Sequence, residues 1–305
     1  MTADVVPLTR VPAVPEIPSP GVATVIRDAL DGSVQRLLAA DPIARVGEDP
    51  EGVHQARVAT RRLRSDLRTF APLLDAAWVT SLRDELRWLG GELGGAREAE
   101  VMLGRLRGRA RALPAEIEAD VSPVLDAAVG DRAAAYDRVL EVLRSSRYLD
   151  LVDRLVQGAI APRMQPDAVS ATADDLTRLA RKPWKRLRRD YVALGADPPD
   201  AALHAVRIRA KRARYAVEAV AAAIDSDQPR KFAAALTGLQ DVLGDHQDAV
   251  VAEAWLRARI ASGNPAETYA TGMLAGLLRD DALAATAALP RAWHRASRRQ
   301  LRSWL

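Results

Sequence analysis

The 305-residue sequence contains no cysteine, which excludes disulfide bonds and thiolate metal sites. Aromatic residues make up only 4% of the chain although hydrophobic residues reach 49%. The core must therefore be built mostly from Ala, Leu and Val, which suits close-packed helices better than sheets. No run of about 18 apolar residues occurs, so no transmembrane helix is predicted.

The N-terminal segment lacks a basic start followed by an apolar stretch, so no secretory signal is predicted and a cytoplasmic location is the default expectation. Prolines are frequent in this segment: Pro7, Pro12, Pro15, Pro18 and Pro20. They predict a disordered or extended tail over residues 1–20.

The remaining sequence has helical periodicity throughout, with no alternating stretch long enough for a sheet. We expect helices over residues 22–40, 51–74, 77–93, 97–111, 121–143 and 149–160. After a Pro-containing connection at 161–167, we expect further helices over 171–194, 201–224, 229–243, 247–261, 265–279 and 282–304. The predicted fold is all-α, with an N-terminal half at 21–165 and a C-terminal half at 166–305.

The two halves repeat each other. Displacing the sequence by 150 residues aligns 53–109 with 203–259 without a gap, and fifteen of these 57 positions are identical. The identities include His54/His204, Arg57/Arg207 and Gly94/Gly244. Such a match indicates one unit used twice, which we expect to pack about a pseudo-two-fold axis.

A row of cations follows one side of the helix predicted at 51–74. With about 100° per residue, five side chains fall within an arc of about 80°. We call them the first basic row: His54, Arg57, Arg61, Arg64 and Arg68. The opposite side is apolar and consists of Ala56, Ala59, Leu63, Leu67 and Phe70.

The repeat carries a second basic row, formed by His204, Arg207, Lys211 and Arg214, opposite Val206, Ala213, Val217 and Val220. Glu218 occupies the position that Arg68 has in the first row. We expect this carboxylate either to cap the row or to pair internally with an arginine.

Two interpretations of these rows compete. Basic residues are mostly arginine, which suits phosphate but is also typical of a GC-rich genome, and charged helix faces are usually just solvated. However, like charges spaced four residues apart cost about 0.2–0.5 kcal/mol per pair. A purely cationic row that occurs twice therefore indicates an anionic ligand.

Other polar residues give weaker signals. Arg62 and Arg212 flank the rows, and Lys182, Lys185 and Arg189 share a face of the helix at 171–194; we treat these as secondary candidates. His246 is predicted to lie in a turn between helices and His294 at the surface. The sequence shows no Walker loop and no HExxH, and we predict no metal site, no cofactor and no catalytic residue.

The segments at 53–64 and 203–214 closely resemble the paired signature of the CHAD (conserved histidine α-helical domain) family. Leu93-Gly94 followed by residues 97–101, and Leu243-Gly244 followed by 248–251, resemble a second family element. The Glu-x-Glu-x-Lys mark of a CYTH domain is absent, because Glu116-Ile117-Glu118 lacks the lysine, so the chain is similar to the standalone type.

This resemblance implies two four-helix bundles around a basic central surface or channel. It also implies binding of inorganic polyphosphate and association with polyphosphate granules and their proteins, with both basic rows lining the surface. Nucleic-acid binding is the runner-up, although the rows lack interleaved aromatics for base stacking. An enzyme acting on phosphoanhydrides is the third alternative and would need clustered acidic metal ligands.

Overall fold

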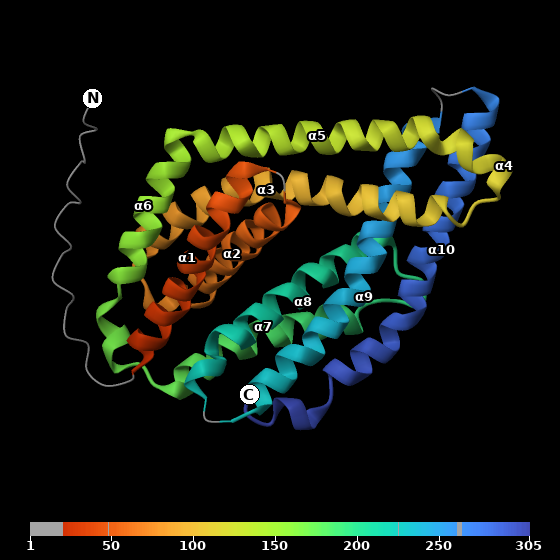
Figure 1. Ribbon diagram of the computed structural model, residues 1–305. Coiled ribbons are helices and arrows are strands. Elements are labelled where there is room, and N and C mark those ends of the chain that lie inside the picture. The colour runs from red at the N-terminus through yellow and green to blue at the C-terminus, as the bar shows by residue number, and fades with distance from the viewer. Residues whose placement is uncertain (1–20, 48, 225, 261–263) are drawn as a thin grey trace, which may run out of the picture.

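The computed structural model describes residues 21–47, 49–224, 226–260 and 264–305, and the predicted tail at 1–20 lies outside the described residues. Helices account for most of this part of the chain (Figure 1). It contains no strand, and a single isolated bridge pairs Leu74 with Met164. The prediction of an all-α fold is confirmed.

The first half contains α1 (Val22–Val46), α2 (Pro50–Thr69), α3 (Ala76–Ala110), α4 (Ala115–Glu118), α5 (Ser122–Arg144) and α6 (Ser146–Ile160). The second half contains α7 (Ala173–Val192), α8 (Asp200–Val220), α9 (Gln228–Arg257) and α10 (Pro265–Ala296). Short 3₁₀ turns connect them at Ala71–Leu73, Ala119–Val121, Pro166–Ser170 and Ala221–Ala223, and another follows at Arg299–Arg302.

The helix starts follow ordinary capping chemistry. The side chain of Asp49 accepts a hydrogen bond from the backbone N–H of Glu51, and Pro50 occupies the first position of α2. Asp75 caps α3 in the same way by accepting from the N–H of Trp78 at 2.7 Å. These caps fix where α2 and α3 begin, and therefore which residues of each helix face the core.

Two apolar cores hold the fold together. The main core takes side chains from α1, α2, α6, α7 and α8 and from the adjoining parts of the long helices. The second core lies where the C-terminal ends of α3 and α9 meet the N-terminal ends of α5 and α10 (Figure 1). Its centre includes Leu103, Leu106, Val121, Leu256 and Leu274. Both cores contain residues of both halves, so the halves are packed against each other at two places.

Three helices are longer than the sequence indicates. We expected breaks after residues 93, 243 and 279, but α3, α9 and α10 each run through without interruption. Each helix contributes to both cores, so burial on either side of the expected break favours continuous helix. This burial outweighs the cost of about 1 kcal/mol for a helical glycine such as Gly94.

The expected position of His246 was also wrong. It lies within α9 rather than in a turn, where its side chain is buried and its Nε2 atom is 3.1 Å from Oδ1 of Asp200. His294 is exposed, as expected. The helices expected to reach residues 224 and 304 end at Val220 and Ala296, each followed by a 3₁₀ turn.

Corresponding helices make corresponding contacts in the two halves. α2 packs between α1 and α3, and α8 packs between α7 and α9. The pseudo-two-fold axis and the half boundary at 165/166 remain predictions. Within the described ranges, no helix combines the length and the apolar composition needed to cross a membrane.

Candidate functional site: the paired basic rows

The two basic rows lie on α2 and α8, which contact each other at the junction of the halves. On α2, Ala56, Ala59, Leu63 and Leu67 are each at most 1% exposed, as are Val206, Ala213 and Val217 on α8. Burying these apolar sides turns the cations of both helices away from the core. Most remain only partly exposed, because the other half of the molecule lies beside them.

Residues of opposite halves touch at this junction. The Cζ atom of Arg61 on α2 lies 5.4 Å from the ring centroid of Tyr215 on α8, and that of Arg214 lies 4.5 Å from the same ring. Both distances suit cation–π attraction. Tyr215 therefore holds one guanidinium from each basic row.

The cations are close enough to perturb each other. The pKa of Lys211 is lowered to about 7, mainly by burial and then by the neighbouring Arg207, Arg61 and Arg57. Burial also lowers the pKa of Arg57, which Glu98 raises and Arg207 lowers. Arg57 and Arg61 belong to one half and Arg207 and Lys211 to the other, so the two rows form one region of positive potential.

The C-terminal end of the first basic row has a different set of neighbours. Burial lowers the pKa of Arg68 to about 10, and Arg212, Arg83 and Arg64 act in the same direction. Burial likewise lowers the pKa of Arg64, and the positive charges of Arg87, Arg83 and Arg212 are the next largest causes of this lowering. This end of the row therefore faces α3 and the middle of α8.

Few carboxylates neutralise the rows. Arg57 is 3.8 Å from Glu98 and Arg207 is 3.9 Å from Asp248, both at the long limit for an ion pair. Arg214 is 3.5 Å from Glu218. Among the described residues, no carboxylate lies within ion-pair distance of Arg61, Arg64, Arg68 or Lys211.

Several polar atoms of the site are buried without a hydrogen-bond partner in the described part of the chain. They are Nδ1 of His54 and the Nε atoms of Arg61, Arg207 and Arg214. A buried donor without a partner costs about 1–3 kcal/mol. The three guanidinium Nε atoms are such donors, so the site concentrates polar groups that the described residues leave unsatisfied.

Glycines on the facing helices lie beside arginines of both basic rows. A Cβ atom added to Gly94 would lie 3.8 Å from Nε of Arg57, and one added to Gly244 would lie 4.0 Å from Nε of Arg207. A Cβ atom added to Gly90 would similarly lie 3.8 Å from an Nη atom of Arg64, and all three distances are ordinary van der Waals contacts. The identity Gly94/Gly244 in the repeat therefore corresponds to the same arginine contact in each half.

The two histidines differ in their surroundings. His54 is partly buried, and burial followed by the nearby Arg97 lowers its pKa. His204 is exposed, and its Nδ1 atom is hydrogen-bonded to the side-chain oxygen of Gln247. His54 is thus part of the positive cluster, whereas His204 lies at its edge.

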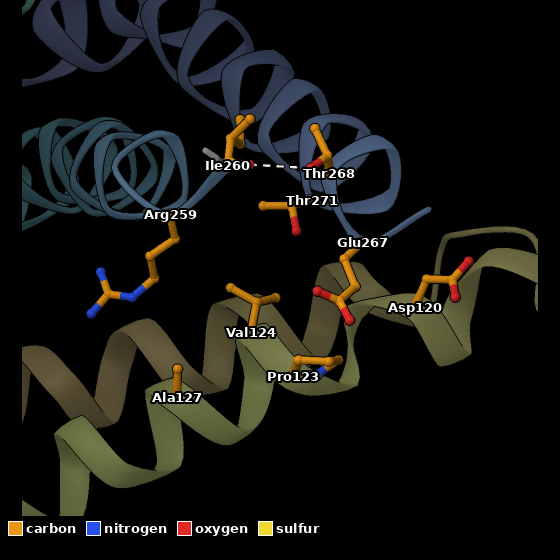
Figure 2. A pocket seen from close by; sticks show the side chains of 9 residues that line it. All are labelled: Asp120, Pro123, Val124, Ala127, Arg259, Ile260, Glu267, Thr268 and Thr271. Atoms are coloured by element: carbon orange, nitrogen blue, oxygen red, sulfur yellow. Dashed lines mark hydrogen bonds between the residues drawn. The ribbon is translucent and has the colours of Figure 1, made fainter. Parts of the chain in front are cut away.

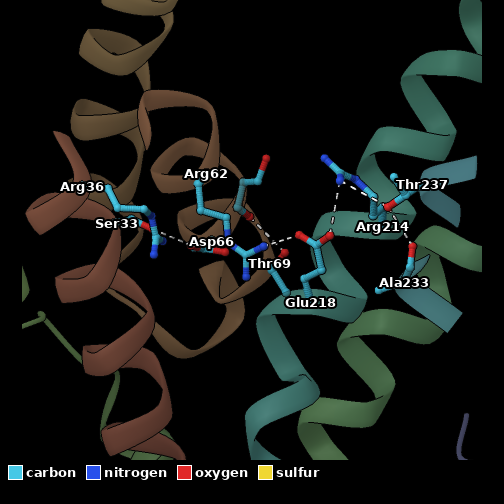
Figure 3. A network of polar contacts seen from close by, with 10 residues as sticks. Ser33, Arg36, Arg62, Asp66, Thr69, Arg214, Glu218, Ala233 and Thr237 are labelled. Atoms are coloured by element: carbon cyan, nitrogen blue, oxygen red, sulfur yellow. Dashed lines mark hydrogen bonds and ion pairs between the residues drawn. The ribbon is translucent and has the colours of Figure 1, made fainter. Parts of the chain in front are cut away.

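The five secondary candidates for ligand binding have different surroundings in the structure. Arg62 is engaged by Asp66 at 3.1 Å and by Glu218, so it is neutralised within the protein (Figure 3). Arg212 joins the cluster at the end of the first row, where Lys182 of α7 lines the same pocket. Lys185 and Arg189 are exposed farther along α7, and Arg189 pairs with the adjacent Asp190.

The sequence did not single out Tyr215, because an aromatic residue on a buried helix face usually indicates core packing alone. Arg83, Arg87 and Arg97 on α3 belong to general basic clusters in the sequence, and only the packing of α3 against α2 brings them to the first basic row. The expected internal pairing of Glu218 is confirmed by its contacts with Arg62 and Arg214.

A pocket beside the second core has a different character (Figure 2). Its volume is about 240 Å³, and its charged lining residues are Asp120, Arg259 and Glu267. Mixed charges of this kind do not favour a polyanion, so we place the candidate site at the basic rows.

Comparison with known proteins agrees with this architecture. Residues 28–257 match the CHAD domain. The chain belongs to the CHAD domain family. Within its 305 residues, no CYTH domain is evident.

Two curated relatives from Mycobacterium tuberculosis, MT2285 of strain CDC 1551 / Oshkosh and Rv2226 of strain H37Rv, are each 34% identical over 270 residues. The matches cover 85% of this chain but 50% of each relative. The chain therefore spans about half the length of the curated relatives it matches.

Two solved structures are similar over nearly the whole CHAD chain. PptA from Streptomyces chartreusis has 27% identity and a TM-score of 0.77, with 90% of this chain and 100% of PptA covered. The CHAD domain from the plant Ricinus communis has 26% identity and a TM-score of 0.71, with 92% and 93% covered.

Proposed function

We propose that this CHAD chain binds inorganic polyphosphate without catalysis, through the two basic rows acting together. The observation that carries the proposal is the convergence of cations from both halves with few carboxylates between them. The resemblance of residues 53–64 and 203–214 to the CHAD signature supports the same ligand.

The chemistry of polyphosphate fits this arrangement. Each phosphate carries a charge and acceptor oxygens, and the chain offers no base edges to be read. The guanidinium groups of the rows donate charge-assisted hydrogen bonds to such oxygens. Bound phosphates would also give partners to the buried Nε atoms of Arg61 and Arg207. Binding therefore relieves both the mutual repulsion and the unpaired donors of the free protein.

The decisive experiment is a titration of long-chain polyphosphate against wild type and the double variant Arg57→Glu with Arg207→Glu. We expect the variant to lose at least about tenfold in affinity, because two central cations become anions. Arg138→Glu with Arg144→Glu is a matched control, since both arginines are exposed on α5 away from the rows. Helical circular dichroism should be unchanged in both variants. Equal affinity of wild type and the central variant would contradict the proposal.

Chain length gives a second criterion. Neighbouring contacts along the rows add avidity, so we expect weaker binding of pyrophosphate than of long polyphosphate. Affinity should also fall steeply with salt, as it does for nucleic-acid backbones. If pyrophosphate bound as tightly as the long polymer, an extended binding surface would be wrong.

Nucleic-acid binding through the same rows is the main competing function. Tyr215 is 5% exposed and is covered by arginines, so it offers no free face for base stacking. We expect DNA and RNA to compete poorly with polyphosphate at equal phosphate concentration. Displacement by either nucleic acid under those conditions would favour the competing function.

Two further parts of the proposal have separate tests. A polyphosphate-processing enzyme would release orthophosphate in the presence of magnesium, and we expect no release above the protein-free control.

Granule targeting predicts that a fluorescent fusion collects on polyphosphate granules in cells. The fusion carrying Arg57→Glu with Arg207→Glu should stay diffuse if the basic rows direct the targeting.

A further inference from the structure

A basic pocket opens at the C-terminal end of the first basic row, between α2, α3, α7 and α8. Its volume is about 480 Å³. Its lining contains seven cations and no carboxylate: Arg68, Arg83, Arg178, Lys182, Arg186, Arg209 and Arg212. We call this the exit pocket.

Most of these cations have no anionic partner. Arg178 pairs with Asp175 at 2.9 Å and Arg209 pairs with Asp190 at 2.7 Å. For the other five, no ion pair is found among the described residues. The Nε atom of Arg83 is also buried without a hydrogen-bond partner. Such a concentration of unpaired positive charge is unfavourable unless an anion enters.

The repeat has a counterpart of this pocket in which the charges are different. Displacement by 150 residues relates Arg68 to Glu218, Arg83 to Ala233, and Arg209 to Ala59. It also relates Ala216, which lines the exit pocket, to Asp66. Of the pocket residues on α2, α3 and α8, only Arg212 has a cationic counterpart, which is Arg62.

In the counterpart, internal contacts occupy this cation (Figure 3). Arg62 is held by Asp66 and by Glu218, and Glu218 is also 3.5 Å from Arg214. Ser33 of α1 donates to Asp66 at 3.4 Å, and Arg36 donates to Ser33 at 2.9 Å. One end of the paired rows is therefore closed by the protein's own carboxylates, while the other end opens into unpaired cations.

The basic surface continues beyond the exit pocket along α7. A shallow hollow of about 380 Å³ on this helix is lined by Arg178, Arg181, Lys182, Lys185, Arg186 and Arg189. Arg178, Lys182 and Arg186 are shared with the exit pocket. The counterpart helix α1 is much less basic, because it has three arginines and three aspartates, whereas α7 has seven cations and three aspartates.

We propose that a bound polyphosphate chain leaves the paired basic rows at one end only, through the exit pocket and onto α7. The inference rests on the proposed function and adds a direction to it. Glu218, Asp66 and Arg62 block the opposite end, so the polymer extends past α7 and not past α1. Long chains consequently make contacts that short chains cannot reach.

The test compares a variant on α7 with its counterpart on α1. Lys182→Glu with Arg186→Glu changes the exit pocket, and Arg27→Glu with Arg45→Glu makes the same total change of charge on α1, outside the contacts of Asp66. Long-chain polyphosphate and tripolyphosphate are titrated against each variant. We expect the α7 variant to lose about tenfold for the long chain and less than about twofold for tripolyphosphate. The α1 variant should bind both ligands as wild type does, within about twofold.

The alternatives give different results. Wild-type affinity of the α7 variant for long chains would overturn the one-ended path, even if Arg57→Glu with Arg207→Glu abolished binding and so upheld the proposed function. Equal losses in the α7 and α1 variants would also overturn it, since charge alone would then explain the effect. Retained tripolyphosphate binding shows that the α7 variant is folded, and an equally large loss of tripolyphosphate binding would contradict the dependence on chain length.

Discussion

Arg61 and Arg214 lie over the same Tyr215 ring, one guanidinium from each half of the CHAD chain. The ring is 5% exposed, and its hydroxyl group is buried without a hydrogen-bond partner in the described residues. Tyr215 contacts the two basic rows through its aromatic face. The arrangement brings like charges together by giving each of them a common attractive neighbour.

This geometry predicts different effects for two substitutions at Tyr215. Tyr215→Phe keeps the ring and removes an unsatisfied hydroxyl, so stability and polyphosphate affinity should stay within about 0.5 kcal/mol of wild type or improve. Tyr215→Ala removes a buried aromatic ring and should cost about 3 kcal/mol or more of unfolding free energy. Urea denaturation measures the stability, and titration the affinity. A large loss of affinity in Tyr215→Phe would show that the hydroxyl contacts the ligand.

Lys211 predicts that affinity depends on pH. Its pKa of about 7 in the free protein means that it loses its charge as pH rises through neutrality. A polyanion favours the charged form, so binding takes up a proton and affinity falls between pH 6 and pH 9. Titrations at several pH values measure this slope.

Lys211→Arg is the matched variant for that measurement, because an arginine stays charged over the whole range. We expect its affinity to change less with pH above 7 than that of wild type. His54 has a lowered pKa and acts in the same direction at lower pH, so the comparison should be made above pH 7. Identical pH profiles for wild type and Lys211→Arg would rule out Lys211 as the titrating group.

The rows themselves could be predicted from the sequence because helical periodicity depends only on local spacing. The first basic row lies on the side of α2 opposite to its apolar residues, and the structure buries these apolar residues as expected. The partners of the rows could not be predicted in this way. Arg83 is brought to Arg68 by the packing of α3 against α2, and Tyr215 to Arg61 by the contact of α8 with α2.

Helix lengths were the least predictable part of the fold. Gly94 and Gly95 indicate a break when they are considered locally, and His246 lies in the corresponding part of the second half. The structure continues α3 and α9 through both places because the same helices must reach the second core. That requirement comes from Leu103, Leu106 and Leu256 meeting across the halves, which local periodicity cannot show.

Asp66 predicts a pH-dependent stability that is independent of ligand binding. Burial raises its pKa to about 7, while Arg62 and Ser33 act in the opposite direction. The folded state thus binds this proton more tightly than the unfolded state, whose pKa is near 3.8. The resulting stabilisation is complete below about pH 4 and is lost as pH rises through 7.

Denaturation of wild type and Asp66→Asn at pH 5 and pH 8 tests this origin. The amide cannot ionise, so the variant should lose less stability between the two pH values, by at least about 1 kcal/mol. Arg62 keeps Glu218 as a partner in the variant, which limits any direct loss. Parallel stability curves for the two proteins would assign the pH dependence to other groups.

At Gly52, α2 approaches α1 closely, and we expect a larger side chain at this position to cause a steric clash. A Cβ atom at this position would lie 2.4 Å from the backbone N of Ala44, so α2 could not keep its distance from α1. We expect Gly52→Ala to cost about 1–3 kcal/mol of unfolding free energy despite the better helix propensity of alanine. Because His54 and Arg57 follow directly on the same helix, displacement of α2 should also weaken polyphosphate binding.

Gly104→Ala is the control for this substitution, because an added Cβ on that exposed position of α3 meets no atom within 4 Å. Here the propensity gain is unopposed, and stability should rise by about 0.5–1 kcal/mol with unchanged affinity. Thermal or urea denaturation of both variants separates steric crowding from backbone entropy. If Gly52→Ala were as stable as Gly104→Ala, the contact between α1 and α2 would have to be looser than the 2.4 Å approach implies.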